Sequence, residues 1–433
     1  MNEPVSRRAV LGGAAAAAGA TALGGLPGIL AHAQAPAYPK GTRLHLLQWS
    51  HYVQAADVLF DKQTAEFAKQ AGVDIQIERI NQNDIQSRVT AAVQSGSGAD
   101  IIIVANNHAH LYESALVDAS DVAEAIGAQQ GGWYDYARVN TFANGRWIGV
   151  PQFIISWAIT YREDWFKEEG LKYPETWDEF RAAGRKLKAK GKPFGQAFGH
   201  SINDPNNWCY PLTWMWGGME VERDGKTVVL DSKATVEAVK FNNVLWKEVF
   251  DEGGLAWDDS NNNRSFLSSD ISLTGNAPSI YVAARKQAPD VYKGTNHGHF
   301  PKGLAGRFYW LPTWNSCVMK YSKNPKLAKE FIRYYMDRKQ FEPYFETMDS
   351  FGIPGTKVWF EHPLWLKDPK TTVFRETLQH ARQVGYAGPP GRKATEALSK
   401  YIIVDMFAKS IQGLAPEEAV KWAAGELRKI YSV

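Results

Sequence analysis

The first third of the chain alternates between apolar runs and helical spacing. Leu44–Trp49 and Ile101–Val104 are short apolar runs typical of buried strands. In Val73–Ile80, β-branched apolar residues alternate with polar ones, which is typical of a strand. A helical pattern follows the first run, and a second one spans Asp84–Val93. This order of strand, helix, strand, helix, strand predicts βαβ units, in which helices cover a mainly parallel sheet.

The middle of the chain predicts a second α/β region. Gln152–Tyr161 is apolar on both sides, so we expect one long strand that passes from one domain into the other. The remaining pattern predicts helices at Glu163–Glu169, Thr176–Lys190 and Lys233–Glu252, and strands at Ser272–Asn276 and Asn315–Lys320. Beyond Pro325 the pattern is helical, apart from loops at Met348–Lys357 and Gly385–Lys393.

The N-terminus predicts an export signal. Arg7-Arg8 precedes a run of Ala, Gly and Leu without charged residues, and Ala31-His32-Ala33 suits a signal peptidase. Paired arginines indicate a twin-arginine signal that is cleaved near Ala33. A membrane anchor is disfavoured because glycines and Pro27 interrupt the segment. We therefore expect a periplasmic protein.

Composition excludes several classes of protein. The 433 residues carry 49 Lys+Arg and 46 Asp+Glu, a formal charge of +3 that gives no broad basic surface for nucleic acid. The two cysteines, Cys209 and Cys317, lack CxxC spacing, and the sequence leaves open whether they are bridged or are two buried thiols.

Motifs for catalysis and metal binding are missing from the sequence. We find no HExxH, GxSxG, Walker or GxGxxG pattern. His108-x-His110 and His297-x-His299 have no local partner that completes a metal site, so we expect solvent-facing loop histidines and neither metal nor cofactor.

Tryptophan and asparagine offer a binding chemistry instead. The chain has 16 tryptophans, and aromatic faces stack on sugar rings or on cations. Asparagines gather at Asn106-Asn107, Asn206-Asn207 and Asn261–Asn263, and their amides suit the hydroxyls of a polyol. The alternatives are tryptophans that pack in the core and asparagines that form turns. Trp49 ends one predicted parallel strand and Asn106-Asn107 follows another, and ligands of such sheets bind at these strand ends.

Several segments, taken together, match a known family. They are Ser95–Val104, Asn144–Lys188, Ile271–Pro278, Ser322–Tyr335 and Ala415–Ala424. The chain resembles the extracellular solute-binding proteins of family 1, the periplasmic receptors of carbohydrate-importing ABC transporters. The resemblance implies a two-lobed periplasmic binding protein of type II, in which hinge strands join two α/β lobes around a ligand cleft.

The resemblance assigns roles to individual residues. Asn107 takes the place of a ligand-bonding carboxylate of maltose-binding members, and Asn207 with Trp208 resembles their aromatic sugar-contact loop. The segment with Asn276 and Pro278 resembles one that usually ends in a stacking aromatic, but Ser279 stands at that position here. Ile155 stands where maltose binders carry an acid. These departures argue against maltose. We expect eight residues to line the cleft: Trp49, Asn106, Asn107, Asn207, Trp208, Asn276, Trp314 and Asn315.

These observations predict the following division and function. Residues 1–33 form the signal, residues 34–152 and 319–345 the N-terminal lobe, and residues 153–318 and 346–433 the C-terminal lobe, with crossings near 151–157 and 314–320. We expect a monomeric receptor that delivers a small carbohydrate or polyol to an ABC permease. A receptor for a cationic solute such as a polyamine is one alternative, and a periplasmic carbohydrate-active enzyme is another.

Overall fold

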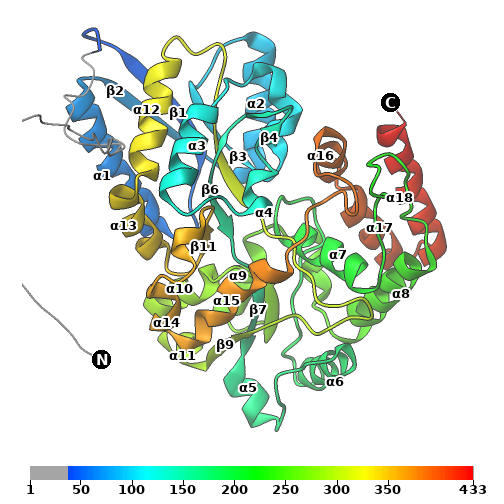
Figure 1. Ribbon diagram of the computed structural model, residues 1–433. Coiled ribbons are helices and arrows are strands. Elements are labelled where there is room, and N and C mark those ends of the chain that lie inside the picture. The colour runs from blue at the N-terminus through cyan, green and yellow to red at the C-terminus, as the bar shows by residue number, and fades with distance from the viewer. Residues whose placement is uncertain (1–37, 433) are drawn as a thin grey trace, which may run out of the picture. The chain divides into compact units, whose positions relative to one another are not determined.

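The computed structural model describes residues 38–432, which contain a six-stranded sheet, a three-stranded sheet and a small two-stranded sheet of β4 (Phe142–Ala143) and β5 (Arg146–Trp147), with helices around them (Figure 1). The six-stranded and three-stranded sheets are called the first and the second sheet. The predicted signal peptide and its cleavage site lie outside the described residues. The first sheet has the strand order β11-β6-β10-β3-β1-β2. Its strands are β1 (Arg43–Trp49), β2 (Asp74–Ile80), β3 (Ile101–Ala105), β6 (Val150–Ile155), β10 (Thr313–Val318) and β11 (Gly352–Pro354).

The predicted βαβ units are present in the first sheet. Strand β1 pairs in parallel with both β2 and β3, and the connections are helices α1 (Gln54–Ala71) and α2 (Ile85–Ser95). Gly72 and Gly96 end these helices in the left-handed conformation, which glycine adopts without a steric penalty. The β3 side chains are buried throughout, as expected for the centre of a sheet that is covered on both faces.

The prediction that each lobe has a mainly parallel sheet is wrong. Strand β10 runs antiparallel to β3 and β6, and β11 runs antiparallel to β6. Two parallel strands need a crossover connection, usually a helix, between them. The sequence pattern shows such connections only among β1, β2 and β3. The first sheet is therefore mixed.

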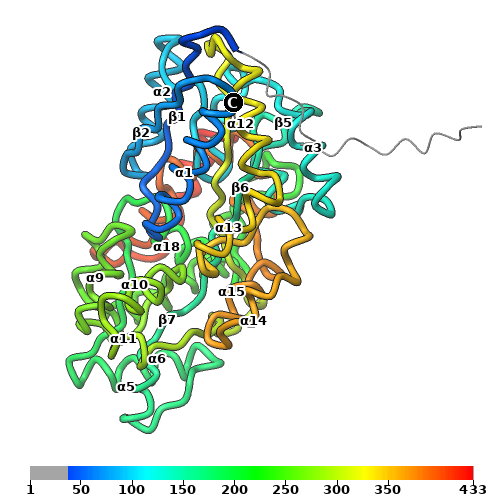
Figure 2. The backbone as a smooth tube through the Cα atoms, turned by 90° about the vertical axis from the view of Figure 1, so that its left-hand side faces the viewer, coloured from blue at the N-terminus to red at the C-terminus, as the bar shows by residue number. Residues whose placement is uncertain are grey.

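The second sheet is antiparallel, with the order β8-β7-β9. Its strands are β7 (Ala158–Arg162), β8 (Leu273–Asn276) and β9 (Thr295–Gly298). The predicted long strand is thus two strands, β6 and β7, separated at Ser156-Trp157. Figure 2 shows the chain passing from β6 in the first sheet to β7 in the second.

The helices divide between the two sheets (Figure 1). We call the first sheet and the helices around it the first half of the molecule. The second sheet and its helices form the second half. The first half also contains α3 (Ser120–Gln129), α4 (Asp135–Arg138), α12 (Pro325–Met336) and α13 (Arg338–Met348). The second half contains α5 (Glu163–Glu168), α6 (Trp177–Lys188), α7 (Asp204–Met215), α8 (Lys233–Glu248), α9 (Asn261–Leu267), α10 (Ser279–Gln287), α11 (Pro289–Gly294), α14 (Leu364–Lys367), α15 (Thr372–Glu376), α16 (Arg392–Ser399), α17 (Ile402–Ile411) and α18 (Pro416–Tyr431).

The sheets differ from the predicted lobe boundaries. Residues 313–318 were assigned to the C-terminal lobe, yet all of β10 pairs within the first sheet. The loop predicted at Met348–Lys357 contains β11, which pairs with β6. The chain therefore leaves the first sheet after Ile155 and returns to it at Thr313.

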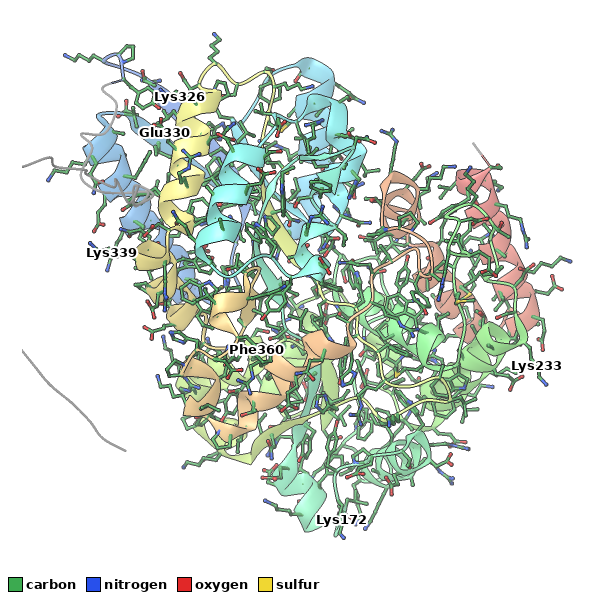
Figure 3. The ribbon with its side chains drawn as sticks, in the orientation of Figure 1. Lys172, Lys233, Lys326, Glu330, Lys339 and Phe360 are labelled. Carbon is green, nitrogen blue, oxygen red and sulfur yellow. The ribbon has the colours of Figure 1, made fainter. Side chains whose placement is uncertain are left out.

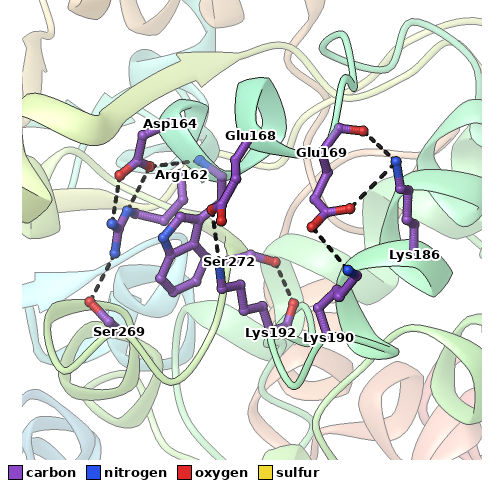
Figure 4. Close-up of polar contacts among 10 residues, drawn as sticks. Arg162, Asp164, Glu168, Glu169, Lys186, Lys190, Lys192, Ser269 and Ser272 are labelled. Carbon is purple, nitrogen blue, oxygen red and sulfur yellow. Dashed lines mark hydrogen bonds and ion pairs between the residues drawn. The ribbon is translucent and has the colours of Figure 1, made fainter.

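The far end of the second half is fixed by local polar contacts (Figure 4). Thr176 and Glu179 form the predicted capping box at the start of α6. Arg162 binds Asp164 at 2.6 Å, and its guanidinium lies 4.0 Å from the centre of the Trp165 ring.

Among residues 38–432, no helix combines the length and apolar character needed to cross a membrane.

Candidate functional site

Two tryptophans, Trp49 and Trp314, meet at the end of the first sheet where strands β1 and β3 finish. We call this end of the sheet the tryptophan edge. Trp49 ends β1, and Trp314 pairs with Ala105 at the end of β3. Their rings stack with centroids 4.6 Å apart and planes 7° from parallel. Both side chains are buried, and the indole N–H of Trp314 has no hydrogen-bond partner in the described chain. A buried donor of this kind favours a ligand that supplies an acceptor.

Two asparagines next to this pair hold the edge in a fixed geometry. Asn106 has a φ of 52°, in the left-handed region that asparagine tolerates. Its Oδ1 accepts the amide N–H of Thr313 at 3.1 Å, and its carbonyl accepts Asn315 Nδ2 at 2.7 Å. Asn106 Nδ2 and Asn315 Oδ1 are buried without a partner among the described residues.

Asn107 lies where the two halves meet. Its Nδ2 donates to the carbonyl of Pro390 at 2.9 Å, and its own carbonyl accepts Thr395 Oγ1 at 3.1 Å. Asn107 Oδ1 is buried and unpartnered in the described chain. A groove of about 460 Å³ adjoins these contacts, and its lining includes Arg138 and Arg392 from opposite halves.

A second set of contacts between the halves involves buried acids. Gln82 of the first half donates to Asp259 Oδ2 at 2.5 Å and to the Tyr52 hydroxyl at 3.1 Å. Asn83 Oδ1 accepts the amide N–H of Ile202 at 3.0 Å. We call the region bounded by these contacts and by those of Asn107 the seam.

Asp204 and Asp259 lie side by side at the seam, at the start of α7. Asp259 accepts the amide N–H of Asp204 at 2.8 Å and the Ser201 hydroxyl at 2.7 Å. Burial raises the pKa of Asp259 to about 6. Burial and the neighbouring Asp259 raise the pKa of Asp204 well above its ordinary value. Charged side chains such as Lys172, Lys233 and Lys339 are instead exposed on the outside of the molecule (Figure 3).

Sequence reasoning missed this acid pair. It noted the asparagine clusters but not that Asp204 precedes one cluster by two residues and Asp259 precedes another. The sequence signal was present, because an acid beside polar amides in two separate segments can form a single site. Only the fold brings residues 204 and 259 together.

Asn207 and Trp208 occupy the first turns of α7, which the sequence analysis treated as a loop. Asn207 Oδ1 is buried without a partner in the described chain. Trp208, contrary to the prediction, packs in the core of the second half, where its indole N–H donates to Asn242 at 2.9 Å. Adjacent helical residues point in different directions, so these two side chains do not share a surface.

Asn276 is also occupied by contacts within the second half. Its Nδ2 donates to Asn263, and its Oδ1 accepts the amide N–H of Ala277 at 2.8 Å. Both ends of the amide are thus used by the protein. The structure brings Trp49, Asn106, Trp314 and Asn315 together, and it puts Asn107 at the seam and Asn207 on a helix that starts there.

The other candidate groups do not form a site. His108, His110 and His297 are buried, which contradicts the prediction of solvent-facing histidines. Burial lowers the pKa of His108 and of His297 to about 4. Residues 38–432 contain no cluster of His, Cys, Asp and Glu that could hold a metal ion. Cys209 and Cys317 are both free and buried.

A family model described as "Bacterial extracellular solute-binding protein" matches residues 52–340. The chain belongs to the bacterial extracellular solute-binding proteins. The predicted family and the prediction of a solute receptor are thereby confirmed. As a member of an extracellular family, this solute-binding protein is exported.

Known relatives of this solute-binding protein agree with that membership. A "Probable ABC transporter-binding protein" of Deinococcus radiodurans is 26% identical over 309 residues, which cover 67% of this chain and 70% of the relative. The maltose-bound MalE3 of T. maritima superimposes with a TM-score of 0.78 at 19% identity, covering 90% of this chain and 100% of the other. A ribitol complex from Agrobacterium radiobacter K84 gives 0.75 at 19% identity, covering 90% and 99%. These structures confirm the predicted two-lobed fold.

Proposed function

We propose that this protein is a periplasmic receptor that binds a small carbohydrate or polyol at the seam and delivers it to an ABC permease. One observation carries the proposal: donors and acceptors of Asn106, Asn107, Trp314 and Asn315 are buried without partners in the described chain, beside a tryptophan pair. Hydroxyl groups both donate and accept hydrogen bonds, so a polyol satisfies such a mixture.

The ligands of related structures support this class of solute. Structures similar to this one hold maltose, tagatose, laminaribiose or ribitol as bound molecules. Ile155 is fully buried and apolar in this chain, at a position where maltose binders carry an acid according to the resemblance. A smaller sugar or polyol suits this chain better than maltose.

Binding is coupled to closure of the two lobes in our proposal. The lobes correspond to the two halves, and the segments around Ser156 and before Thr313 act as hinges. The bonds from Gln82 to Asp259 and from Asn107 to Pro390 join opposite halves and stabilise a closed arrangement. A ligand that contacts both halves favours this state, because its affinity for the closed form is higher.

The cellular setting follows from the sequence. A twin-arginine signal with cleavage near Ala33 exports the chain to the periplasm, where it acts as a monomer. The permease recognises the closed, loaded form. The protein releases its solute unchanged, since its sequence holds none of the catalytic motifs sought.

Isothermal titration of the purified protein with monosaccharides, disaccharides, polyols and polyamines tests the proposal. We expect heat from at least one carbohydrate or polyol, and mass spectrometry should recover that molecule unaltered. Heat only from polyamines would overturn the carbohydrate assignment. A chemically altered product would favour the carbohydrate-active enzyme.

A further inference from the structure

The unpartnered groups around Asp204 are all acceptors. Asp204 Oδ2, Asn203 Oδ1, Asn207 Oδ1 and Gln82 Oε1 have no hydrogen-bond partner in the described chain. Each of these side chains is at most 5% exposed. Gln82 binds the neighbouring Asp259 through its Nε2, so its amide lies at the acid pair. This part of the seam needs hydrogen-bond donors.

The raised pKa of Asp204 favours its protonated, neutral form as long as no cation is near. Burial contributes most to this rise in pKa; Asp259 and Asp258 raise it further, the Asn262 amide lowers it, and no basic side chain is among these influences. Arg264 acts on Tyr52 and Asp258, and its Nη1 donates to Ser260 at 2.6 Å. Buried carboxylates without a cation are costly, so a positive charge from outside the protein is favourable here.

The tryptophan edge differs, because its unpartnered groups include donors as well as the acceptor Asn315 Oδ1. Asn106 Nδ2 and Trp314 Nε1 are buried donors without acceptors in the described chain. A protonated polyamine has no acceptor to offer them, whereas a sugar or polyol has hydroxyl oxygens. The two clusters therefore differ: unpartnered donors occur at the tryptophan edge, whereas the unpartnered groups around Asp204 are acceptors.

We propose that Asp204 binds an ammonium group of the solute, so that the natural ligand is an amino sugar or an aminopolyol. This inference rests on the proposed carbohydrate-binding function. An ammonium supplies three N–H donors and a positive charge, whereas a hydroxyl supplies one donor and no charge. The hydroxyl groups of the same molecule meet Asn106 and Trp314.

Calorimetry with matched pairs tests the inference. The pairs are glucose and glucosamine, galactose and galactosamine, and sorbitol and its 1-amino-1-deoxy derivative, with putrescine and spermidine as a third class. We expect one amine to bind at least ~10-fold tighter than its neutral partner. In Asp204→Asn, affinity for that amine should fall about 30-fold, because a buried charge pair is broken, while affinity for the neutral partner stays within about threefold.

Controls separate charge from folding. Asp258→Asn removes a neighbouring exposed charge and should preserve the preference for the amine. Thermal unfolding of Asp204→Asn should resemble that of the unmutated protein. Neutral sugars that bind as tightly as their amines, or an Asp204→Asn variant with an unchanged amine preference, would overturn the inference and leave the carbohydrate receptor standing. Binding of polyamines alone, or of no compound, would overturn both proposals.

Discussion

Two groups of tryptophans in this molecule look alike in the sequence and differ in the fold. In the second half, Trp208 donates to Asn242 and Trp214 donates to Glu220, and both rings are buried among other side chains. At the edge of the first sheet, Trp314 is just as buried but its N–H has no partner in the described chain. The indole N–H of Trp177, in the core of the second half, is also buried without a partner in the described chain. The comparison therefore teaches that an unpartnered N–H marks a candidate binding tryptophan only together with a position such as that of Trp314, where strands β1 and β3 end.

Replacing Trp208 should have the largest effect on stability. Its ring contacts Trp177, Phe250 and Phe300 in the core of the second half. Trp208→Ala leaves a cavity and an unpartnered Asn242, and should lower the free energy of unfolding by about 3–5 kcal/mol. Urea unfolding followed by circular dichroism measures this loss. A loss below 1 kcal/mol would show that Trp208 is not a core residue.

The Glu220 partner of Trp214 predicts a pH effect. Burial raises the pKa of Glu220 from its ordinary value of 4.5 to about 8. The folded state therefore holds this proton more tightly than the unfolded state, so its contribution to stability is full below pH 4.5 and is lost as the pH rises toward 8.

Glu220→Gln tests this effect because glutamine cannot ionise but still accepts the Trp214 N–H. The variant should match the unmutated protein at pH 5 and exceed its free energy of unfolding at pH 9 by on the order of 3 kcal/mol. Urea unfolding at both pH values gives the difference. Equal differences at pH 5 and pH 9 would contradict the raised pKa.

Asn106 lies beside the tryptophan edge and has a backbone in the left-handed region. Asn106→Ala loses the bond to Thr313 and replaces asparagine, which tolerates the left-handed region, by a residue that does so less well. The free energy of unfolding should therefore fall by about 1–3 kcal/mol. Asn106→Gly relieves the strain and should regain part of that stability. Both variants lack the free Nδ2, so titration should find both weaker for the solute. Full affinity in Asn106→Gly would remove Asn106 from the site.

The smallest expected effect concerns the indole N–H of Trp314. Trp314→Phe keeps a ring to stack on Trp49 and removes the unpartnered donor, so affinity should fall about fivefold, the value of one neutral hydrogen bond. Trp208→Phe is the matched control, and its affinity should be unchanged. If the two variants lose affinity equally, the distinction between the two groups of tryptophans is wrong.

Periodicity predicted the local elements more reliably than the way they assemble. Strands β1, β2 and β3 and the capping box at Thr176 were found because each depends on residues close in sequence. The predicted strand Gln152–Tyr161 hid a break, because buried residues on both faces give no alternation that marks its end. The ligand site stays a prediction: Trp208 and Asn276 bind other groups inside the second half, and Asp204 and Asp259 were not identified from the sequence.

The sequence by itself determined the family, the βαβ start of the chain and the edge where Trp49 and Asn106 lie. Those features follow from hydrophobic spacing and from residues next to strand ends. Only the tertiary structure decided which tryptophan N–H finds an acceptor and which acids become neighbours. The reason is physical: a hydrogen bond or a raised pKa depends on groups that are distant in sequence, and burial assigns those neighbours only when the chain has folded.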